Sequence, residues 1–491
     1  MQLAGRLIEW LAFGLWKLAA ICAFVALFLF PVIIHEPLVF VPMLAGIGCC
    51  LGLRYVPAAR EAIGRLLAQG SPRRWIVALM AAAVVVRIPV MIWPSPPYSD
   101  MFFYHRAAVM LAHGAPGAWG RDGLGIFYPP GESMWLAPWI AVFGGHLWVI
   151  TASNILLTVA AIPFLYKAFE TASAHAAKAA AMMLALFPSL VLWSGTAGHE
   201  TVEIFVLSVL LFLYTKIVAA GTTGRVLALW AVFGAVLGAG SLVRPTFPAL
   251  LALTAVAAVM KAPSWKRIVP GMAVAAAFMA LVIAPWTMRN YRDYGRFCLI
   301  SANGGFSLLG VVHPLSDGVR DYNPPDLGKG LDLIERDHLS MNLAMYYVTS
   351  DPKRMARLAV TKTIREWGSD TSSSIDAVVG VPPRGGDSLK HAIQAVLAYS
   401  WGWFVCAWAL GAVAMKQKTP AAPVDLWCVF WVLTIFGMFL LFSPQARYHY
   451  PVLPFAAGVF GPGLITWLGI RDESADAVCS VKHESERMLA Y

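Results

Sequence analysis

Two acidic residues of this 491-residue chain stand where a carboxylate could do chemistry at a membrane surface. Asp100 lies in PYSDMFFYHRAAVMLAHG, shortly after an apolar stretch long enough to span a bilayer. Glu200 lies in AGHETVEIF and opens another apolar stretch. Because a carboxylate can act as a general base for a hydroxyl, both are candidate catalytic residues. A structural role is the alternative, since acids also cap and stabilise helix N-termini.

Several arginines also recur at the ends of apolar stretches. Arg244 stands in SLVRPTF, Arg289 in APWTMRNYRDYGRF and Arg447 in ARYHYPVLPF. A planar guanidinium group binds two oxygens of a phosphate at once, so these side chains are suited to a phosphorylated lipid. The alternative for each arginine alone is an interfacial side chain that extends towards water.

The elements that would position these residues are membrane-spanning helices. Apolar runs long enough to cross roughly 30 Å of hydrocarbon predict about twelve crossings. Met134 to Phe143 is too short for a span and favours an interfacial or re-entrant helix. The twelve runs are 8–34, 38–53, 74–93, 147–168, 176–196, 199–217, 224–243, 245–261, 267–287, 391–415, 424–443 and 448–470.

Basic residues gather in alternate connections between these runs, which is the positive-inside pattern. The segment from Arg54 to Arg74 and the one from Lys261 to Arg267 are strongly basic, whereas the loops with Asp100 and Arg447 carry few cations. This asymmetry predicts a cytoplasmic N-terminus and places Asp100, Glu200 and the arginines on the outer side.

The runs and loops predict one membrane domain with an inserted module. The stretch from Asp332 to Trp367 has helical spacing with mixed charges, which is typical of amphipathic helices lying against a membrane. The predicted parts are an N-terminal helix pair and basic loop (1–73), a transmembrane core (74–287) with a first outer loop (94–133), an extracytoplasmic module (288–390), C-terminal transmembrane helices (391–470) and a cytoplasmic tail (471–491).

The composition supports a membrane protein and excludes several other classes. Hydrophobic residues make up 59% of the chain and charged residues 13%, where a soluble domain carries about a quarter charged residues. The net charge of +10 is scattered between apolar runs, so nucleic acid is not an expected partner. Seven cysteines form no CxxC pattern, and no phosphate loop, HExxH motif, nucleophile elbow or Rossmann fingerprint is present.

A series of segments in a fixed order resembles the GT-C glycosyltransferases, in particular the bacterial relatives of protein O-mannosyltransferases and of lipid A aminoarabinose transferases. The resemblance extends from Trp75 to Gly469 and implies an all-α polytopic membrane protein with about 12–13 transmembrane helices, interfacial helices and a small extracytoplasmic module. The segments are SDMFFYH, FYPPGESMWLAPWIAVFGG, GHETVEIFVLSVLLFLYTK, LVRPTFPALLAL, APWTMRNYRDYGRF, ISANGGFSLLG and RYHYPVLPF.

The resemblance also implies roles for single residues. Asp100 matches the catalytic base of the family and Glu200 its second acidic position, but Met101 stands where many members have another acid. Donor phosphate would be held by Arg289 and Arg447, with weaker matches in Arg244 and Lys362. Further candidates for substrate contact are Tyr104, His105, Arg106, Tyr128, Glu132, His199, Asn303, Tyr448 and His449.

The implied reaction is transfer of a sugar from a polyprenyl-phosphate carrier to a lipid, glycan or protein acceptor at the outer face of a bacterial inner membrane, with inversion at the anomeric carbon. No cofactor is required, and a divalent metal has no support because Met101 replaces the second acid. Membrane lipids are the remaining expected partners.

Two other functions remain open. A transporter or flippase would also have many helices with few internal charges, although paired broken helices in two matching halves are not visible in the sequence. A non-catalytic subunit of an envelope polysaccharide machine is the other alternative, which Met101 would favour.

Overall fold

The computed structural model describes residues 2–34, 37–115, 124–220, 223–261, 265–318, 322–371, 386–415 and 421–470. Within these ranges the regular structure is helical throughout, which confirms the all-α fold class. The predicted cytoplasmic tail lies outside the described residues.

The α-helices are α1 (Gln2–Ile34), α2 (Pro37–Gly52), α3 (Pro57–Ala68), α4 (Pro72–Ile92), α5 (Ser99–Ala112), α6 (Leu124–Phe127), α7 (Gly131–Phe143), α8 (Leu147–Phe169), α9 (Ala174–Leu186), α10 (Pro188–Trp193), α11 (Glu200–Ala219), α12 (Thr223–Val243), α13 (Ala249–Lys261), α14 (Trp265–Tyr294), α15 (Gly304–Val312), α16 (Leu333–Ser350), α17 (Pro352–Trp367), α19 (Gly386–Ala414), α20 (Pro423–Phe439) and α21 (Leu453–Leu468). Two short 3₁₀ helices are η1 (Leu53–Tyr55) and η2 (Ala446–Val452).

The chain is a multi-pass membrane protein. In the described part, 8 helices are long and apolar enough to cross a membrane, namely α1, α4, α8, α11, α12, α14, α19 and α21 with η2. The bent pair formed by α2 and α3 raises the number to 9. The other three predicted runs fall in the shorter apolar helices α9, α13 and α20. Length and composition therefore assign fewer spans than the 12–13 expected.

Proline accounts for one of these short helices. Pro188 disfavours helical geometry in the residue before it, so α9 ends at Leu186 and α10 restarts at Pro188. Backbone carbonyls left free at such a break are costly inside a membrane. The buried guanidinium of Arg87 on α4 satisfies them, donating to the carbonyl oxygens of Ala185 at 2.7 Å and Leu184 at 3.0 Å.

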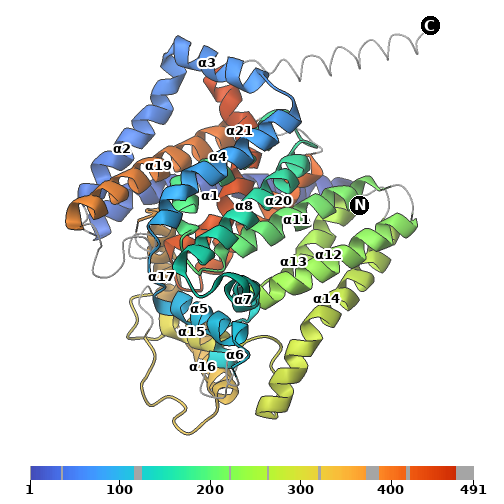
Figure 1. Ribbon diagram of the computed structural model, residues 1–491. Coiled ribbons are helices and arrows are strands. Elements are labelled where there is room, and N and C mark those ends of the chain that lie inside the picture. The colour runs from blue at the N-terminus through green and yellow to red at the C-terminus, as the bar shows by residue number, and fades with distance from the viewer. Residues whose placement is uncertain are drawn as a thin grey trace.

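The two ends of the helix bundle differ in character. Helices α5, α6, α7, α15 and α16 gather at one end, whereas α3 lies at the other (Figure 1). Helices α4 and α21 each run between the ends, so the segments before and after them are far apart (Figure 1). The residues predicted to do chemistry lie in α5, at the start of α11 and in η2, which contacts α11 and α21.

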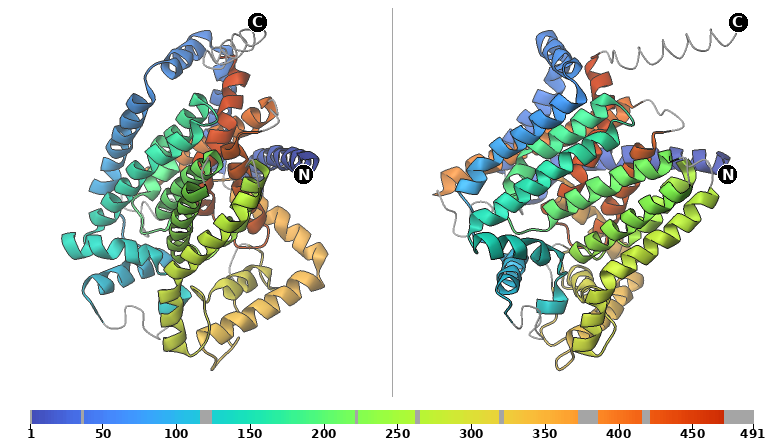
Figure 2. Two further views of the ribbon diagram at one scale, coloured as in Figure 1. Left: turned by 90° about the vertical axis from the view of Figure 1, so that its right-hand side faces the viewer. Right: turned by 45° about the vertical axis from the view of Figure 1, so that its right-hand side comes forward.

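In its described part, the predicted module contains helices α15, α16 and α17, which share a small core. Helices α15, α16 and α17 lie at the same end of the molecule as α5 in both views of Figure 2. Leu309, Val312 and Ala344 belong to a cluster of buried residues that joins α15 to α16. Helix α16 begins with a capping box, in which Asp332 and Glu335 each satisfy a backbone amide of the first turn. The amphipathic stretch predicted from the sequence is thus two separate helices.

The opposite locations of α3 and α5 allow the predicted topology to be tested. Arg65 precedes α4 in the sequence and Arg106 follows it, and both side chains are exposed. In a background without other cysteines, we expect an impermeant maleimide to label an Arg106→Cys variant in spheroplasts with an intact inner membrane. An Arg65→Cys variant should react only after that membrane is permeabilised. Labelling of Arg65→Cys in intact spheroplasts would contradict the predicted orientation.

Candidate functional site

Asp100 is in the first turn of α5 but does not cap that helix. The N-cap residue is Tyr98, and no side-chain capping bond is present. Ser99 has a φ of 53°, and it is the one non-glycine residue with positive φ in the described part of the chain. Such strained residues cluster at functional sites. The Asp100 carboxylate instead points to Arg447, so helix capping does not explain this acid.

The centre of the site is the Arg447 side chain in η2. Its terminal nitrogens donate to the two Asp100 oxygens, Nη1 to Oδ1 at 3.2 Å and Nη2 to Oδ2 at 2.8 Å. Its Nε donates to Oε1 of Gln445 at 2.9 Å and lies 3.7 Å from Oε1 of Glu200. One guanidinium therefore holds α5, η2 and α11 together by a bidentate pair and a longer ion pair.

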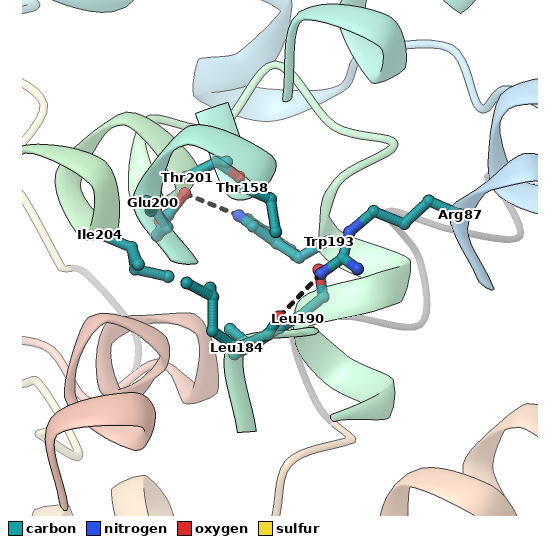
Figure 3. A pocket seen from close by; sticks show the side chains of 9 residues that line it. Arg87, Thr158, Leu184, Leu190, Trp193, Glu200, Thr201 and Ile204 are labelled. Atoms are coloured by element: carbon teal, nitrogen blue, oxygen red, sulfur yellow. Dashed lines mark hydrogen bonds between the residues drawn. The ribbon is translucent and has the colours of Figure 1, made fainter. Parts of the chain in front are cut away.

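The three charged side chains differ in their access to water. The Asp100 side chain is 16% exposed, that of Arg447 is 8% exposed and that of Glu200 is fully buried. Asp100 is thus the acid that a molecule approaching from outside can reach. Glu200 accepts a hydrogen bond at 2.8 Å from the Trp193 indole, as Figure 3 shows.

A second ion pair lies one helical turn deeper. Arg244 donates to Oε2 of Glu203 at 2.7 Å, and both side chains are buried. The ring of Tyr448 lies between the two arginines, 5.1 Å from the Arg447 guanidinium and 5.3 Å from that of Arg244. Cation–π contacts of this kind hold both cations in place without neutralising them.

Aromatic side chains surround the outer part of the cluster. The Tyr104 ring packs edge-on against Tyr128 at 5.5 Å and against His199 at 5.9 Å. Tyr128 also stacks on Phe103 at 5.3 Å. The structure therefore brings the predicted residues Tyr104, Tyr128 and His199 together next to Asp100. A lining of this type suits the faces of a sugar ring or an isoprenoid unit.

The surroundings of Asp100 determine its protonation. Burial tends to raise the pKa of Asp100, but the charge and hydrogen bonds of Arg447, with a contribution from His199, outweigh it, so the pKa lies below its ordinary value. Asp100 is consequently ionised near neutral pH. In Glu132, burial and the nearby Glu200 instead raise the pKa well above the ordinary value. Its two oxygens have no hydrogen-bond partner among the described residues, and only 1% of the residue is exposed.

The free space next to Glu200 is small. A void of about 10 Å³ is lined by Arg87 of α4, Trp193 of α10, Glu200 of α11 and further side chains of α8, α9, α10 and α11 (Figure 3). Such a volume holds about one water molecule. This void therefore has no room for a larger molecule. Among the described residues, no cluster of three His, Cys, Asp or Glu side chains could hold a metal ion.

Other predicted phosphate ligands have different partners. Arg289 is near the end of α14, where it donates to the Gly125 carbonyl at 3.0 Å and pairs with Asp293 at 2.9 Å. Asn303 precedes α15, where its side chain accepts from Ser301 at 3.4 Å. These two residues belong to the contact between α14, α6 and α15. Lys362 is buried on α17 and donates to the carbonyl of Leu441.

Three further candidates, His449, Arg106 and His105, differ in how far their side chains are exposed. His449 is fully buried, with its Nε2 3.0 Å from Asp370 and its ring stacked on Trp401 at 4.1 Å. No surface of His449 is available to a substrate, so we assign it to the support of η2. Arg106 is exposed on α5, and His105 is half-buried with its pKa lowered by burial.

Sequence reasoning missed several members of the polar cluster. Glu203 follows Glu200 by three positions, so both lie on one face of α11, and this spacing could have indicated it. Glu366 and Asp370 gave no comparable signal because their partner His449 is distant in sequence. Gln445, two residues before Arg447, is a neutral side chain and was not singled out. Arg87 stood inside an apolar run and could have been singled out as an intramembrane charge.

The chain is structurally similar to GT-C glycosyltransferases. No protein-family model matches its sequence, and curated protein sequences give no significant match. The oligosaccharyltransferase of Archaeoglobus fulgidus, in complex with Zn and sulfate, aligns with a TM-score of 0.49 and 15% identity over 79% of this chain and 48% of that one. The same protein with an inhibitory peptide and a dolichol-phosphate gives 0.43 and 14% over 80% and 50%.

ArnT from Cupriavidus metallidurans, bound to undecaprenyl phosphate, gives a TM-score of 0.39 and 15% identity over 81% of this chain and 76% of that chain. The chain spans about half the length of the archaeal oligosaccharyltransferase that it matches.

The raised pKa of Glu132 predicts how stability depends on pH. The folded protein keeps a proton there that the unfolded chain loses above its ordinary value of 4.5. Stability linked to this group is therefore complete below about that pH and is lost as the pH rises towards the folded-state pKa. We expect Glu132→Gln to raise Tm at pH 7.5 and to have a smaller effect at pH 5.

A matched control is Glu61→Gln, because the Glu61 side chain is 68% exposed. It should leave the Tm unchanged at both values of pH. Thermal unfolding of the two purified variants in one detergent is the measurement. If Glu132→Gln followed the wild-type pH profile, Glu132 would be ionised in the folded protein.

Proposed function

We propose that this protein transfers a sugar from a polyprenyl-phosphate donor to an acceptor hydroxyl at the outer face of a bacterial inner membrane. The observation that carries the proposal is the bidentate pair of Asp100 and Arg447, at the end of the spanning helices. It combines an ionised carboxylate, which the acceptor hydroxyl needs, with a guanidinium, which a leaving phosphate needs. The resemblance of the surrounding sequence segments to GT-C glycosyltransferases supports the same reaction.

The donor phosphate is assigned to the side of the site that carries the two arginines. A sugar linked to a polyprenyl phosphate has one negative charge on its phosphodiester, and the leaving phosphate gains a second as the sugar departs. Arg447 is fixed by Gln445 and Tyr448, so it can stabilise this added charge without reorganising. Arg244 adds a second positive charge behind Tyr448.

Asp100 is assigned to the acceptor. The hydroxyl oxygen attacks the anomeric carbon as its proton passes to the Asp100 carboxylate. The bond from the anomeric carbon to the phosphate oxygen breaks, and the polyprenyl phosphate leaves with the electron pair. Because attack and departure take place on opposite faces of the carbon, the anomeric configuration is inverted.

The ion pair connects binding of the donor to activation of the base. In the ligand-free protein, Arg447 lowers the pKa of Asp100, which makes this carboxylate a weak base. A phosphate that binds Arg447 takes over part of its charge and its hydrogen bonds. Asp100 then becomes a stronger base only when the donor is in place.

The proposed reaction requires a donor and an acceptor but no cofactor. Glu200 keeps Arg447 in position from the buried side, and its own hydrogen bond to Trp193 fixes it. Tyr104, Tyr128 and His199 form the wall against which the sugar or the first isoprenoid unit would pack. Lipid, glycan and protein acceptors all present a hydroxyl group, which is the acceptor group that the proposed reaction requires.

Asp100→Asn tests the assigned base. Asn has the same shape but accepts no proton, so we expect transfer to fall roughly a hundredfold to ten-thousandfold. The measurement is turnover of purified protein with a panel of labelled polyprenyl-phosphate sugars. Asp326→Asn is the matched control, since Asp326 is exposed on the segment between α15 and α16, and it should retain full activity. Parent-like turnover of Asp100→Asn would exclude this residue as the base.

Arg447 and Arg289 make a second test, because both were candidates for the phosphate and have different surroundings. We expect Arg447→Gln to lower turnover about a hundredfold to a thousandfold, by analogy with loss of one oxyanion ligand. Arg289→Gln should have a much smaller effect, since its partners Gly125 and Asp293 lie on α6 and α14, outside the cluster around Asp100.

An Arg447→Lys variant separates charge from geometry. It keeps the positive charge but loses the planar fork, so an intermediate activity is expected. If Arg289→Gln were the more damaging substitution in folded protein, the phosphate site would have to be moved to the end of α14.

A further inference from the structure

Two adjoining cavities lie at the end of the molecule opposite to Asp100. One has a volume of about 480 Å³ and lies between α2, α3, α9, α19 and α21. The other, of about 600 Å³, lies between α3, the start of α9 and the end of α21. Leu67 and His175 line both, so the two spaces share a wall. Each volume falls in the range of roughly 300–1,000 Å³ that is typical of ligand sites.

The distance between the two cavities and the proposed active site follows from the helices that run from one to the other. Helix α4 starts at Pro72, near α3, and ends at Ile92, shortly before Asp100. Its 21 residues correspond to about 31 Å of helix. Helix α21 leads in the same way from the segment of Arg447 to Leu468, which lines the first cavity. The cavities are therefore separate from the proposed transferase site (Figure 1).

The larger part of the first cavity is lined by hydrocarbon side chains. Leu66, Met182, Leu186, Phe460 and Ile465 are among the residues that form it. An open apolar space of this kind would be unfavourable in water, but beside the hydrophobic region of a bilayer it suits an acyl chain.

The second cavity is polar and positively charged. Arg60, Arg65 and Lys178 line it, and Glu61 is the single acid in its lining. Glu61 is 3.8 Å from Arg65, and both are largely exposed, so this pair is weak. The Nε of Arg60 is buried and has no hydrogen-bond partner among the described residues. The cavity thus carries an excess of positive charge and one unsatisfied donor.

The geometry of α3 places both cavities at a membrane interface. This helix bends 86° away from α2, and the two helices together form one apolar candidate for a span. Glu61 and Arg65 are exposed on one face of α3, while Leu67 is buried on the face that also carries Arg60. Amphipathic helices with these properties lie in the headgroup region of a bilayer. The charged cavity is therefore at headgroup depth and the apolar cavity at acyl-chain depth.

We propose that the paired cavities bind one anionic glycerophospholipid from the leaflet that α3 faces. Its phosphate would contact Arg60 and Arg65, and an acyl chain would fill the cavity beside Met182 and Phe460. Charge complementarity selects this occupant, because the cations have no comparable number of acids among the residues that line the cavity. A free anion would leave the apolar cavity next to these cations unfilled. The bound lipid would hold α3 against α9 and α21.

The test measures lipid binding and requires no transfer activity. Native mass spectrometry of the full-length protein in detergent would be performed with dioleoyl-phosphatidylglycerol and with dioleoyl-phosphatidylcholine. We expect one molecule of phosphatidylglycerol to bind, with phosphatidylcholine at least tenfold weaker. Arg60→Gln combined with Arg65→Gln should weaken binding of phosphatidylglycerol roughly tenfold or more, because each interfacial cation contributes to attraction of an anionic lipid.

The control is a second double variant, in which the net charge changes by the same amount as in the Arg60 and Arg65 variant. Arg6 and Arg225 are exposed and do not line either cavity. Their replacement by Gln should leave binding unchanged. A separate variant, Ala179→Leu, adds bulk to the apolar cavity without altering the charge and should also weaken binding.

Three results would overturn the proposal. Equal binding of phosphatidylcholine would remove the role of charge. Equal loss of binding in the Arg6 and Arg225 control would show that net charge alone attracts the lipid. Tighter binding of a polyprenyl phosphate than of phosphatidylglycerol, with the same dependence on Arg60 and Arg65, would assign the cavities to the carrier lipid instead.

Discussion

The Arg447 guanidinium, shared between Asp100 and Glu200, is the interaction on which the arrangement of the site depends. Each of these three charges would be costly in a largely buried position without the others. Asp100 and Arg447 are 347 residues apart in the chain. The start of α5, the start of α11 and η2 are therefore held together by one set of charges. Breaking the pair removes compensation from the fully buried Glu200 as well, so its effect would extend beyond the exposed surface.

A second polar network supports the first from the module. His449 is two residues from Arg447, and its two ring nitrogens face Asp370 and the backbone of Glu366, at the end of α17. Ser189, at the start of α10, also donates to Asp370. Trp401 stacks on the same imidazole at 4.1 Å. Glu366 and Asp370, at and just after the end of α17, thus help to fix the short helix that presents Arg447.

Much of the fold was predictable from the sequence, and so were the members of the candidate site. Apolar runs located the helices, and residue type together with position at span ends singled out Asp100, Glu200 and Arg447. The acid that each arginine pairs with was not predictable. Arg289 and Arg447 look equivalent in sequence, but Arg289 pairs with Asp293 and Arg447 pairs with Asp100. Span lengths were also overestimated, because proline breaks such as Pro188 do not interrupt an apolar run.

Arg87 has a consequence for how the chain is inserted into the membrane. Its carbonyl partners Leu184, Ala185 and Leu190 are about a hundred residues further along, as the separations of 97, 98 and 103 show. When α4 leaves the ribosome, the one of these hydrogen bonds that its arginine can form is to the Ala83 carbonyl of the same helix. An arginine at the centre of a spanning helix costs roughly 2.5–3.5 kcal/mol of insertion free energy, and Arg87 lies nearer to the end of α4. The remaining hydrogen bonds of Arg87 form only after α9 and α10 have been synthesised, so this side chain ties the final position of α4 to helices made about a hundred residues later.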